Sequence, residues 1–390
     1  MKLLTLTILI FLTSFSAFAD QVFMEPFNPV TPSVPAQGRA YTAIAEGYNA
    51  LFTNPAGFSR TPMGFTFSTQ GGVNTSLSAL GEVLSNLSSF QNFNASSGLS
   101  NSSVSLVNDI VTKYGFGGNF ALGMGWVGGN LGIGLAIQGR TFQKGLNVLN
   151  ANGPFDLTTG LVVGYSVPFK LGWAKLNVGL DVRPMQKTFN DNIYLVDLLG
   201  AGASNISNLT VYNGFGLGWD WGAILDFGLT PTGYWTAGLA LRDIGSTVFN
   251  FHQYTFSDVE KSWTFANGSN TSPTQTYRIP MTVNVGGSWS PDMGMRKLIV
   301  DPRLELDLQI PLEDQFTEPS FWTWIHVGGQ IKFLNFLSLR TGLNQGYLTF
   351  GFGVKVFALD INASIYTDEL GRFIGSYPRN AASIEAALRF

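Results

Sequence analysis

Alternation of apolar and polar residues is the feature that most constrains how this 390-residue chain can fold. In the stretch 301–310, three Leu and one Ile alternate with Arg, Glu, Asp and Gln, and the stretches 131–140, 176–183 and 383–390 repeat the pattern. Successive side chains of a β-strand point to opposite faces, so each stretch predicts a strand with one apolar and one polar face. Both a soluble β-sandwich and a membrane β-barrel alternate in this way, so the pattern alone leaves these two folds open.

The N-terminus predicts export. Lys2 precedes an apolar run from Leu3 to Phe15, and Ser16-Ala17-Phe18-Ala19 places small residues where a signal peptidase reads them. We therefore predict a signal peptide over 1–19 with cleavage after Ala19. The run is too short for a good transmembrane helix, although an uncleaved anchor is the alternative.

The composition favours the membrane barrel over the sandwich. Charged residues make up 12% of the chain, against roughly a quarter in soluble domains, and aromatic residues make up 14%. Apolar residues are plentiful but dispersed, as in a barrel whose strands turn only alternate residues towards lipid. The chain has no cysteine, which rules out a disulfide framework, and its net charge of −3 gives no reason to expect a nucleic-acid partner.

Strand spacing predicts an all-β, transmembrane antiparallel barrel of about fourteen strands, an even number as bacterial barrels prefer. We expect strands near 62–70, 114–126, 130–141, 155–168, 172–185, 212–228, 232–245, 278–290, 298–310, 322–333, 335–343, 346–356, 358–366 and 381–390. Short turns alternate with long polar connections near 71–113, 142–154, 184–211, 246–277, 311–320 and 367–380. This asymmetry is typical of outer-membrane barrels, with short periplasmic turns and long external loops. The tight turn Asn344-Gln345-Gly346 is the exception on the long-loop side.

The segment 20–61 differs from the rest of the chain. It contains Pro26, Pro29, Pro32 and Pro35 and has no period of two. Proline cannot donate a hydrogen bond to a β-ladder, so this stretch is not a barrel strand. Its Ala- and Tyr-rich part ends in an Asn-Pro turn and predicts a compact segment able to sit inside the barrel.

These residues carry a resemblance to a known family. Arg39–Ala45, followed by Asn54-Pro55-Ala56-Gly57 just before the first strand, resembles the plug of FadL-type long-chain fatty acid transporters. The stretches 343–347 and 366–371 resemble C-terminal hairpins of a divergent FadL-like and PorV-like branch, and the terminal Phe390 resembles a barrel-assembly signal. The resemblance implies three parts: signal peptide 1–19, plug or hatch 20–61, and barrel 62–390.

The resemblance also implies a mechanism. Members bind hydrophobic acids at the outer face, pass them into a plugged barrel and release them sideways where a strand is kinked. Asn54, Pro55, Ala56 and Gly57 would shape the plug turn and make no chemical contact with the ligand. No cofactor is implied.

Candidate ligand-binding residues follow from the needs of a fatty acid, an apolar trough and one positive group. The candidates are Phe23, Phe27 and Arg39 in the plug, for which packing against the wall is the alternative role. Leu77, Leu80, Leu84 and Leu87 have helical spacing and predict a short amphipathic loop helix, either a capture surface or a lid. Alternation also directs five arginines into the lumen, Arg140, Arg183, Arg242, Arg303 and Arg340. There the favoured role is an ion-pair network with Asp181, Asp226, Glu305, Asp307 and Glu385.

The sequence gives no indication of an enzyme. His252 is expected in an aromatic loop, and His326 in a strand beside Trp322 and Trp324, where packing is the default role. No Ser-His or paired-acid constellation is evident, and scattered histidines without cysteine argue against a metal site.

Three functions stay open. The first is an outer-membrane transporter of long-chain fatty acids or other small hydrophobic molecules. The second is a PorV-like scaffold that docks secreted or surface proteins and transports nothing. The third is an aqueous porin, which a plugged lumen disfavours. In each case the partners expected include outer-membrane lipid and, during biogenesis, the outer-membrane assembly machinery.

Overall fold

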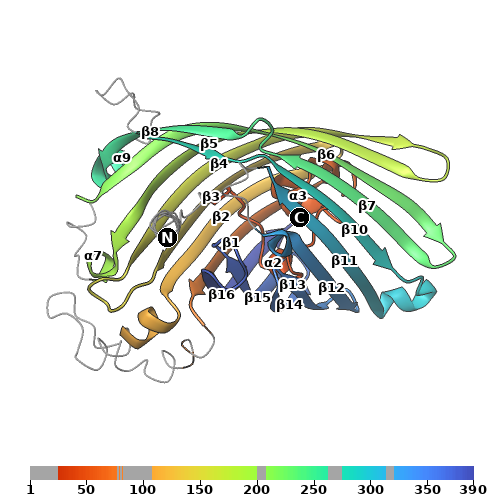
Figure 1. Ribbon diagram of the computed structural model, residues 1–390. Coiled ribbons are helices and arrows are strands. Elements are labelled where there is room, and N and C mark those ends of the chain that lie inside the picture. The colour runs from red at the N-terminus through yellow and green to blue at the C-terminus, as the bar shows by residue number, and fades with distance from the viewer. Residues whose placement is uncertain are drawn as a thin grey trace, which may run out of the picture.

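The computed structural model describes residues 25–76, 79, 81, 108–199, 208–261, 275–312 and 320–390 (Figure 1). The predicted signal peptide with its cleavage site and Phe23 lie outside the described residues. So do Leu77, Leu80, Leu84 and Leu87, the residues of the predicted loop helix.

The described strands form one antiparallel sheet that closes on itself, because β1 pairs with β16 and β5 pairs with β6. The strands are β1 (Gly64–Asn74), β2 (Phe116–Gly128), β3 (Leu131–Gln143), β4 (Asn152–Lys170), β5 (Lys175–Tyr194), β6 (Thr210–Thr230), β7 (Gly233–Arg242), β8 (Thr247–Thr255), β9 (Gln275–Ile279), β10 (Thr282–Ser290), β11 (Val300–Pro311), β12 (Ile325–Phe333), β13 (Leu337–Asn344), β14 (Tyr347–Val356), β15 (Leu359–Glu369) and β16 (Pro378–Arg389). β8 continues β7 and β9 leads into β10, each across a short interruption, so the ring contains fourteen wall strands. The predicted barrel of about fourteen strands is confirmed.

The alternation places apolar side chains outside and polar side chains inside. In β11, Leu304 and Leu306 are 56% and 53% exposed, whereas Glu305 and Asp307 are 4% and 1% exposed. Phe350 and Phe352 on β14 are likewise exposed on the outer face. A closed barrel leaves no sheet edge unpaired, and an apolar outer band suits it to a lipid bilayer. The fold is therefore that of a transmembrane β-barrel.

Turn lengths differ between the two ends of the barrel. β2 and β3 are joined by two residues, β6 and β7 by two, and β14 and β15 by two, all at the end where β1 begins. A single turn of 3-10 helix, η2 (Gly294–Leu298), joins β10 to β11 at this end. The opposite end carries longer connections, which include the short helices α7 (Leu195–Leu199) and α9 (Phe256–Lys261) and the 3-10 helix η3 (Phe321–Trp324). By the rule for outer-membrane barrels, the short-turn end faces the periplasm.

Two of the predicted loops were wrong in part. β5 continues to Tyr194, inside the predicted loop 184–211, and β8 and the first three residues of β9 lie inside the predicted loop 246–277. Residue His252 consequently belongs to strand β8. These extensions carry polar outward residues, such as Asn190 and Asn250, because they lie at the long-loop end and need no apolar outer face. The apolar–polar alternation of lipid-facing strands therefore does not predict these extensions.

None of the helices in the described ranges is both long enough and apolar enough to cross a membrane.

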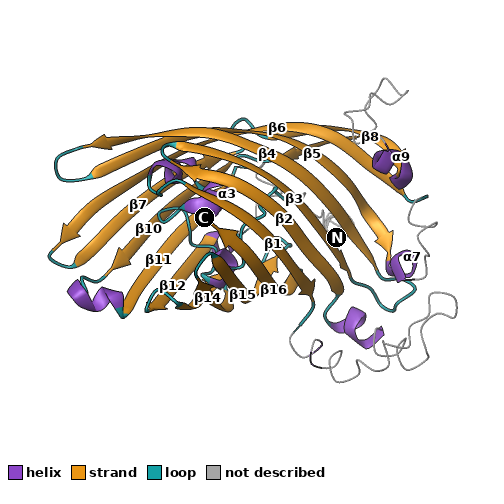
Figure 2. Ribbon diagram, turned by 180° about the vertical axis from the view of Figure 1, so that it is seen from behind, coloured by secondary structure: helices purple, strands orange, loops and turns teal. Residues whose placement is uncertain are grey.

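The N-terminal segment, residues 25–61, lies inside the ring of strands, as both views show (Figures 1 and 2). It contains α2 (Ser33–Ala36), α3 (Gly47–Thr53) and the 3-10 helix η1 (Pro55–Ser59). Phe52 and Phe58 are fully buried, and the edge of the Phe27 ring meets Phe52 at 5.7 Å between ring centroids. These rings, together with lumen-facing wall residues, form the principal hydrophobic core.

Candidate functional site in the barrel lumen

The Asn54-Pro55-Ala56-Gly57 sequence builds a turn that docks on the barrel wall. Asn54 Oδ1 accepts a hydrogen bond from the Ala56 amide at 3.1 Å and so caps η1, in which Pro55 occupies the first turn. The other side of the amide, Asn54 Nδ2, donates to the Thr42 carbonyl at 3.0 Å and to the Leu239 carbonyl of β7 at 3.2 Å. One side chain therefore both caps the turn and attaches it to the wall.

Glycines on the wall make room for this turn. A Cβ on Gly222 would lie 1.9 Å from Asn54 Oδ1, and a Cβ on Gly179 would lie 2.4 Å from the Pro55 backbone. Across the lumen, a Cβ on Gly38 of the segment would lie 2.3 Å from the Val327 carbonyl oxygen of β12. The N-terminal segment thus contacts opposite walls at backbone distance.

Buried acid side chains also hold the segment. Asp307 Oδ2 of β11 accepts hydrogen bonds from the Tyr41 and Thr42 amides at 2.9 and 2.8 Å. The His326 ring donates from Nδ1 to the Gly38 carbonyl at 2.9 Å. Asp307 is therefore engaged with the segment's backbone, and no arginine pairs with it among the described residues.

Arg39 forms a two-point ion pair with the wall. Its Nε and Nη2 donate to the two carboxylate oxygens of Asp368 at 2.9 and 3.0 Å, and its guanidinium lies 5.4 Å from the centre of the Tyr366 ring. A bidentate arginine–carboxylate pair is among the stronger polar contacts in proteins. Arg39, a candidate ligand residue, is thus already paired with the wall, and Phe27, another candidate, is packed against Phe52.

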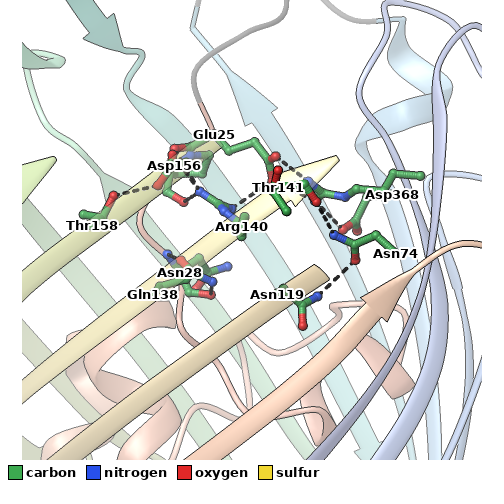
Figure 3. Close-up of polar contacts among 12 residues, drawn as sticks. Glu25, Asn28, Asn74, Asn119, Gln138, Arg140, Thr141, Asp156, Thr158 and Asp368 are labelled. Atoms are coloured by element: carbon green, nitrogen blue, oxygen red, sulfur yellow. Dashed lines mark hydrogen bonds and ion pairs between the residues drawn. The ribbon is translucent and has the colours of Figure 1, made fainter. Parts of the chain in front are cut away.

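Glu25 stands at the centre of a charged network between β3 and β16 (Figure 3). Arg140 Nη1 donates to Glu25 at 2.9 Å, and Arg379 donates to both Glu25 oxygens at 2.5 and 2.7 Å. Burial would raise the pKa of the Glu25 carboxyl, but Arg140 and Arg379 outweigh it and hold this pKa well below its usual range. Arg379 also reaches Asp368 at 3.1 Å, so the network continues to Arg39.

A polar cavity of about 250 Å³ lies beside this network, on the long-loop side of the N-terminal segment. Pro32, Pro35 and Arg39 of the segment line it. A second cavity, of about 570 Å³, lies on the short-turn side and is lined by Ser33, Gln37 and Tyr41 of the same segment. Residues 32–41 therefore border both cavities.

A second charged cluster lies where β7 is interrupted. Arg183 Nη2 on β5 donates to Asp220 at 2.7 Å and to Asp243 at 3.0 Å, and Arg242 Nε contacts Asp220 at 3.4 Å. Asp181 approaches Arg183 only to 3.9 Å. The chain leaves the ladder after Arg242 through Asp243, Gly245 and Ser246, all with positive φ, and re-enters it at Thr247. The charged cluster thus supports an irregular point in the wall.

An aromatic cluster lines the lumen on the long-loop side of this interruption. The Phe189 ring of β5 lies 4.7 Å from Phe251, 5.6 Å from Tyr212 and 5.1 Å from Tyr277, between ring centroids. Phe249 stacks on Phe251 at 5.6 Å. Lys187, two residues before Phe189 on the same face, contacts Asp156 and Thr158. This cluster was not predicted, because Phe189, Phe249, Phe251 and Tyr277 fell in predicted loops and Tyr212 at the very start of a predicted strand. The alternation of Thr247, Phe249 and Phe251 was the signal that could have located it.

The remaining charges proposed from the sequence occupy separate sites. Arg303 pairs with Glu305 at 2.6 Å. Arg340 donates to the amide side chains of Gln330 and Asn362, both at 2.9 Å, and to no carboxylate among the described residues. Asp226 pairs with Arg60 at 2.8 Å, and Glu385 pairs with Arg389 at 3.2 Å. The roles of these partners were missed, because Glu25 and Arg60 lie in the segment without periodicity and Arg379 and Arg389 lie at the two ends of β16.

Within the described ranges, no group of three or more His, Asp or Glu side chains is placed to hold a metal ion. His326 is buried against Gly38, and His252 lies on the outward face of the β8 ladder beside Asn213 of β6.

The geometry defines a membrane-spanning β-barrel whose lumen holds its own N-terminal segment. No protein-family model matches the chain, and no curated protein matches it. Among solved structures, the chain is similar to the toluene transporter TodX of P. putida, with 10% identity, 93% of this chain and 98% of that chain covered, and a TM-score of 0.47.

The toluene transporter TbuX of Ralstonia pickettii gives 12% identity, 93% and 98% coverage and a TM-score of 0.46. A FadL homologue of Pseudomonas aeruginosa gives 11% identity, 94% and 98% coverage and a TM-score of 0.41. Because all three scores are below 0.5 at such low identity, they do not assign the chain to a family.

Proposed function

We propose that this chain is an outer-membrane transporter that takes up small hydrophobic molecules, with long-chain fatty acids as the first candidates. The observation that carries the proposal is the aromatic cluster of Phe189, Tyr212, Phe249, Phe251 and Tyr277 on the lumen face of the wall. Phe249 and Phe251 are fully buried and Phe189 is nearly so, so an apolar ligand would have to enter between these rings. A water-filled pore has no need of such an apolar lining, whereas an apolar ligand gains by contact with it.

The N-terminal segment serves as the plug in this proposal. It is attached to opposite walls by Asn54, Asp307 and Arg39, and it occupies the space between the two polar cavities. These contacts support a role as a barrier to free diffusion along the barrel axis. They also disfavour the aqueous porin.

Release would be lateral, at the interruption between β7 and β8. The wall strand leaves the regular ladder over residues 243–246 directly beside the aromatic cluster, and the facing strand is broken at Pro280, which has no amide hydrogen to donate. Ile244 is 37% exposed at this point and presents an apolar side chain. A hydrophobic ligand held by Phe251, at the long-loop end, would thus meet this interruption first on its way towards lipid. Lys187 supplies a nearby cation for an acidic head group, in competition with Asp156.

Equilibrium binding of a long-chain fatty acid to the full mature barrel in detergent tests the proposal. We expect saturable, chain-length-dependent binding that Phe251→Ala weakens about tenfold, because the loss of about 1.4 kcal/mol of apolar contact corresponds to a tenfold change in affinity. Phe350→Ala, which removes an outward-facing ring of β14, is the matched control and should leave binding within twofold.

No binding of fatty acids or related lipids would overturn the transporter. The next experiment would then be an affinity isolation of protein partners, which the scaffold alternative requires.

A further inference from the structure

The cavity on the short-turn side is lined by an excess of cationic side chains. Its volume is about 570 Å³, and the turn residue Asn335, the first residue of β1 (Gly64) and Phe390 all line it, which places it at the periplasmic mouth. Five basic side chains from neighbouring strands also line it, and they are Arg303, Lys332, Arg340, Lys355 and Arg389.

Two of these cations are neutralised by carboxylates. Arg303 pairs with Glu305 at 2.6 Å, and Arg389 pairs with Asp360 and with Glu385. Both pairs lie along the wall, so these arginines are committed to the structure of the barrel.

The other three have no carboxylate contact among the described residues. Arg340 donates from Nε to Gln330 and from Nη1 to Asn362, which are neutral amides. Lys332 and Lys355 make no side-chain hydrogen bond or ion pair within the described part of the chain. Glu46 lines the same cavity and Asp301 is the ladder partner of Lys332, but neither forms an ion pair with them.

Gly353 on the neighbouring strand leaves space for the Arg340 side chain at the cavity. A Cβ on Gly353 would lie 2.7 Å from Arg340 Nη1, so the missing side chain is what allows the guanidinium to lie across β14. Lys332, Arg340 and Lys355 come from the adjacent strands β12, β13 and β14, and alternation directs all three to the lumen.

We propose that Lys332, Arg340 and Lys355 form a binding site for a phosphate-bearing anion at the periplasmic mouth of the barrel. A phosphate group offers several acceptor oxygens and more than one negative charge, so it can engage a planar guanidinium and two ammonium groups together. A carboxylate offers one charge and two oxygens and satisfies fewer of these donors. The site is separate from the aromatic cluster and does not depend on the transport proposal.

The test is isothermal titration calorimetry of the full mature protein in detergent, in phosphate-free buffer of low ionic strength. Inorganic phosphate and a short-chain phosphatidic acid below its micelle concentration are titrated separately. We expect saturable binding of inorganic phosphate, weakened at least about tenfold in K332Q/K355Q and retained in K332R/K355R. Binding should also weaken as salt is added, because exposed charges are screened.

Lys170→Gln is the matched control, because it removes a positive charge from an exposed position at the same end of the barrel, outside the cavity. It should change binding less than twofold. Binding of phosphatidic acid alone, with the same sensitivity to K332Q/K355Q, would support the site and identify its phosphate as that of a lipid. Failure of both probes to bind, or an effect of Lys170→Gln equal to that of the double variant, would overturn the proposal.

Discussion

Replacing Glu25 by Gln should loosen the N-terminal segment within the barrel. Glu25 accepts hydrogen bonds from Arg140 at 2.9 Å and from Arg379 at 2.5 and 2.7 Å, so the neutral amide removes a charge shared by two arginines. Breaking a fully buried ion pair costs about 3–5 kcal/mol. The Glu25 side chain is 25% exposed, so solvent screening reduces the expected loss to about 1–2 kcal/mol.

The assay is hydrogen–deuterium exchange of the backbone amides of residues 40–56 in the folded barrel. A loss of about 1–2 kcal/mol raises the open population, and with it the exchange rate, by about 5- to 30-fold. Glu46→Gln is the matched control, because Glu46 belongs to the same segment and makes no ion pair among the described residues. Unchanged exchange in Glu25→Gln, or an equal rise in Glu46→Gln, would refute the reasoning.

The same contact predicts a pH dependence with a definite sign. The pKa of Glu25 is lowered in the folded barrel from an ordinary value of 4.5. Its ion pairs therefore stabilise the docked N-terminal segment fully at pH values above 4.5. The contribution is lost as the pH falls towards the folded pKa. Exchange of residues 40–56 should therefore stay constant between pH 5 and 8, after correction for intrinsic rates, and the effect of Glu25→Gln should shrink in acid.

Three further substitutions probe the packing of the segment and the wall, each read as a change in the free energy of unfolding in urea. Gly38→Ala should destabilise the fold by about 2–4 kcal/mol, because the added Cβ would lie 2.3 Å from the Val327 carbonyl oxygen. Gly47→Ala is the control: Gly47 also has a positive φ but open space around it, so this change should cost only about 1 kcal/mol. Equal losses for the two variants would count against the close contact at Gly38. Phe52→Ala should cost about 3–5 kcal/mol, since the ring is fully buried, and a loss below 1 kcal/mol would show that the core is loosely packed. Asp220→Asn should cost about 3 kcal/mol by leaving Arg183 and Arg242 short of a buried partner, and a neutral result would contradict the role of this cluster in supporting the β7–β8 interruption.

Most strands of the barrel could be predicted from the sequence, because the wall separates membrane lipid from a polar lumen. Each strand must place one set of alternate residues in lipid and the other in the lumen. The pattern Leu304, Glu305, Leu306 therefore predicts both a strand and which of its faces points into the lumen. Beyond the membrane this requirement ends. That is why β8, the start of β9 and the end of β5, whose outward residues include Asn190 and Asn250, were predicted to be loops.

The lumen contacts could be predicted only in part. Arg303 and Glu305 share one strand, so alternation places them on one face and suggests their pairing. Arg39 meets Asp368 across 329 residues, and Glu25 meets Arg379 across 354, and no local pattern encodes such pairs. Nothing in the sequence around Gly38 indicates that its lack of a side chain allows close contact with the backbone of β12. These contacts form only when the strands close into a ring and bring distant residues together, so the sequence pattern does not predict them.

Photolabelling with a long-chain fatty acid that carries a diazirine on its tail tests most directly whether hydrophobic ligands occupy the lumen. The full mature protein is labelled in detergent, with and without excess unlabelled fatty acid, and the modified peptides are identified by mass spectrometry. Saturable labelling of the 185–194 and 247–255 peptides, shifted to about tenfold higher fatty acid concentration in Phe251→Ala, is the result expected from the aromatic cluster. Labelling confined to outward-facing peptides of β13 and β14, and unaffected by competitor, would contradict it.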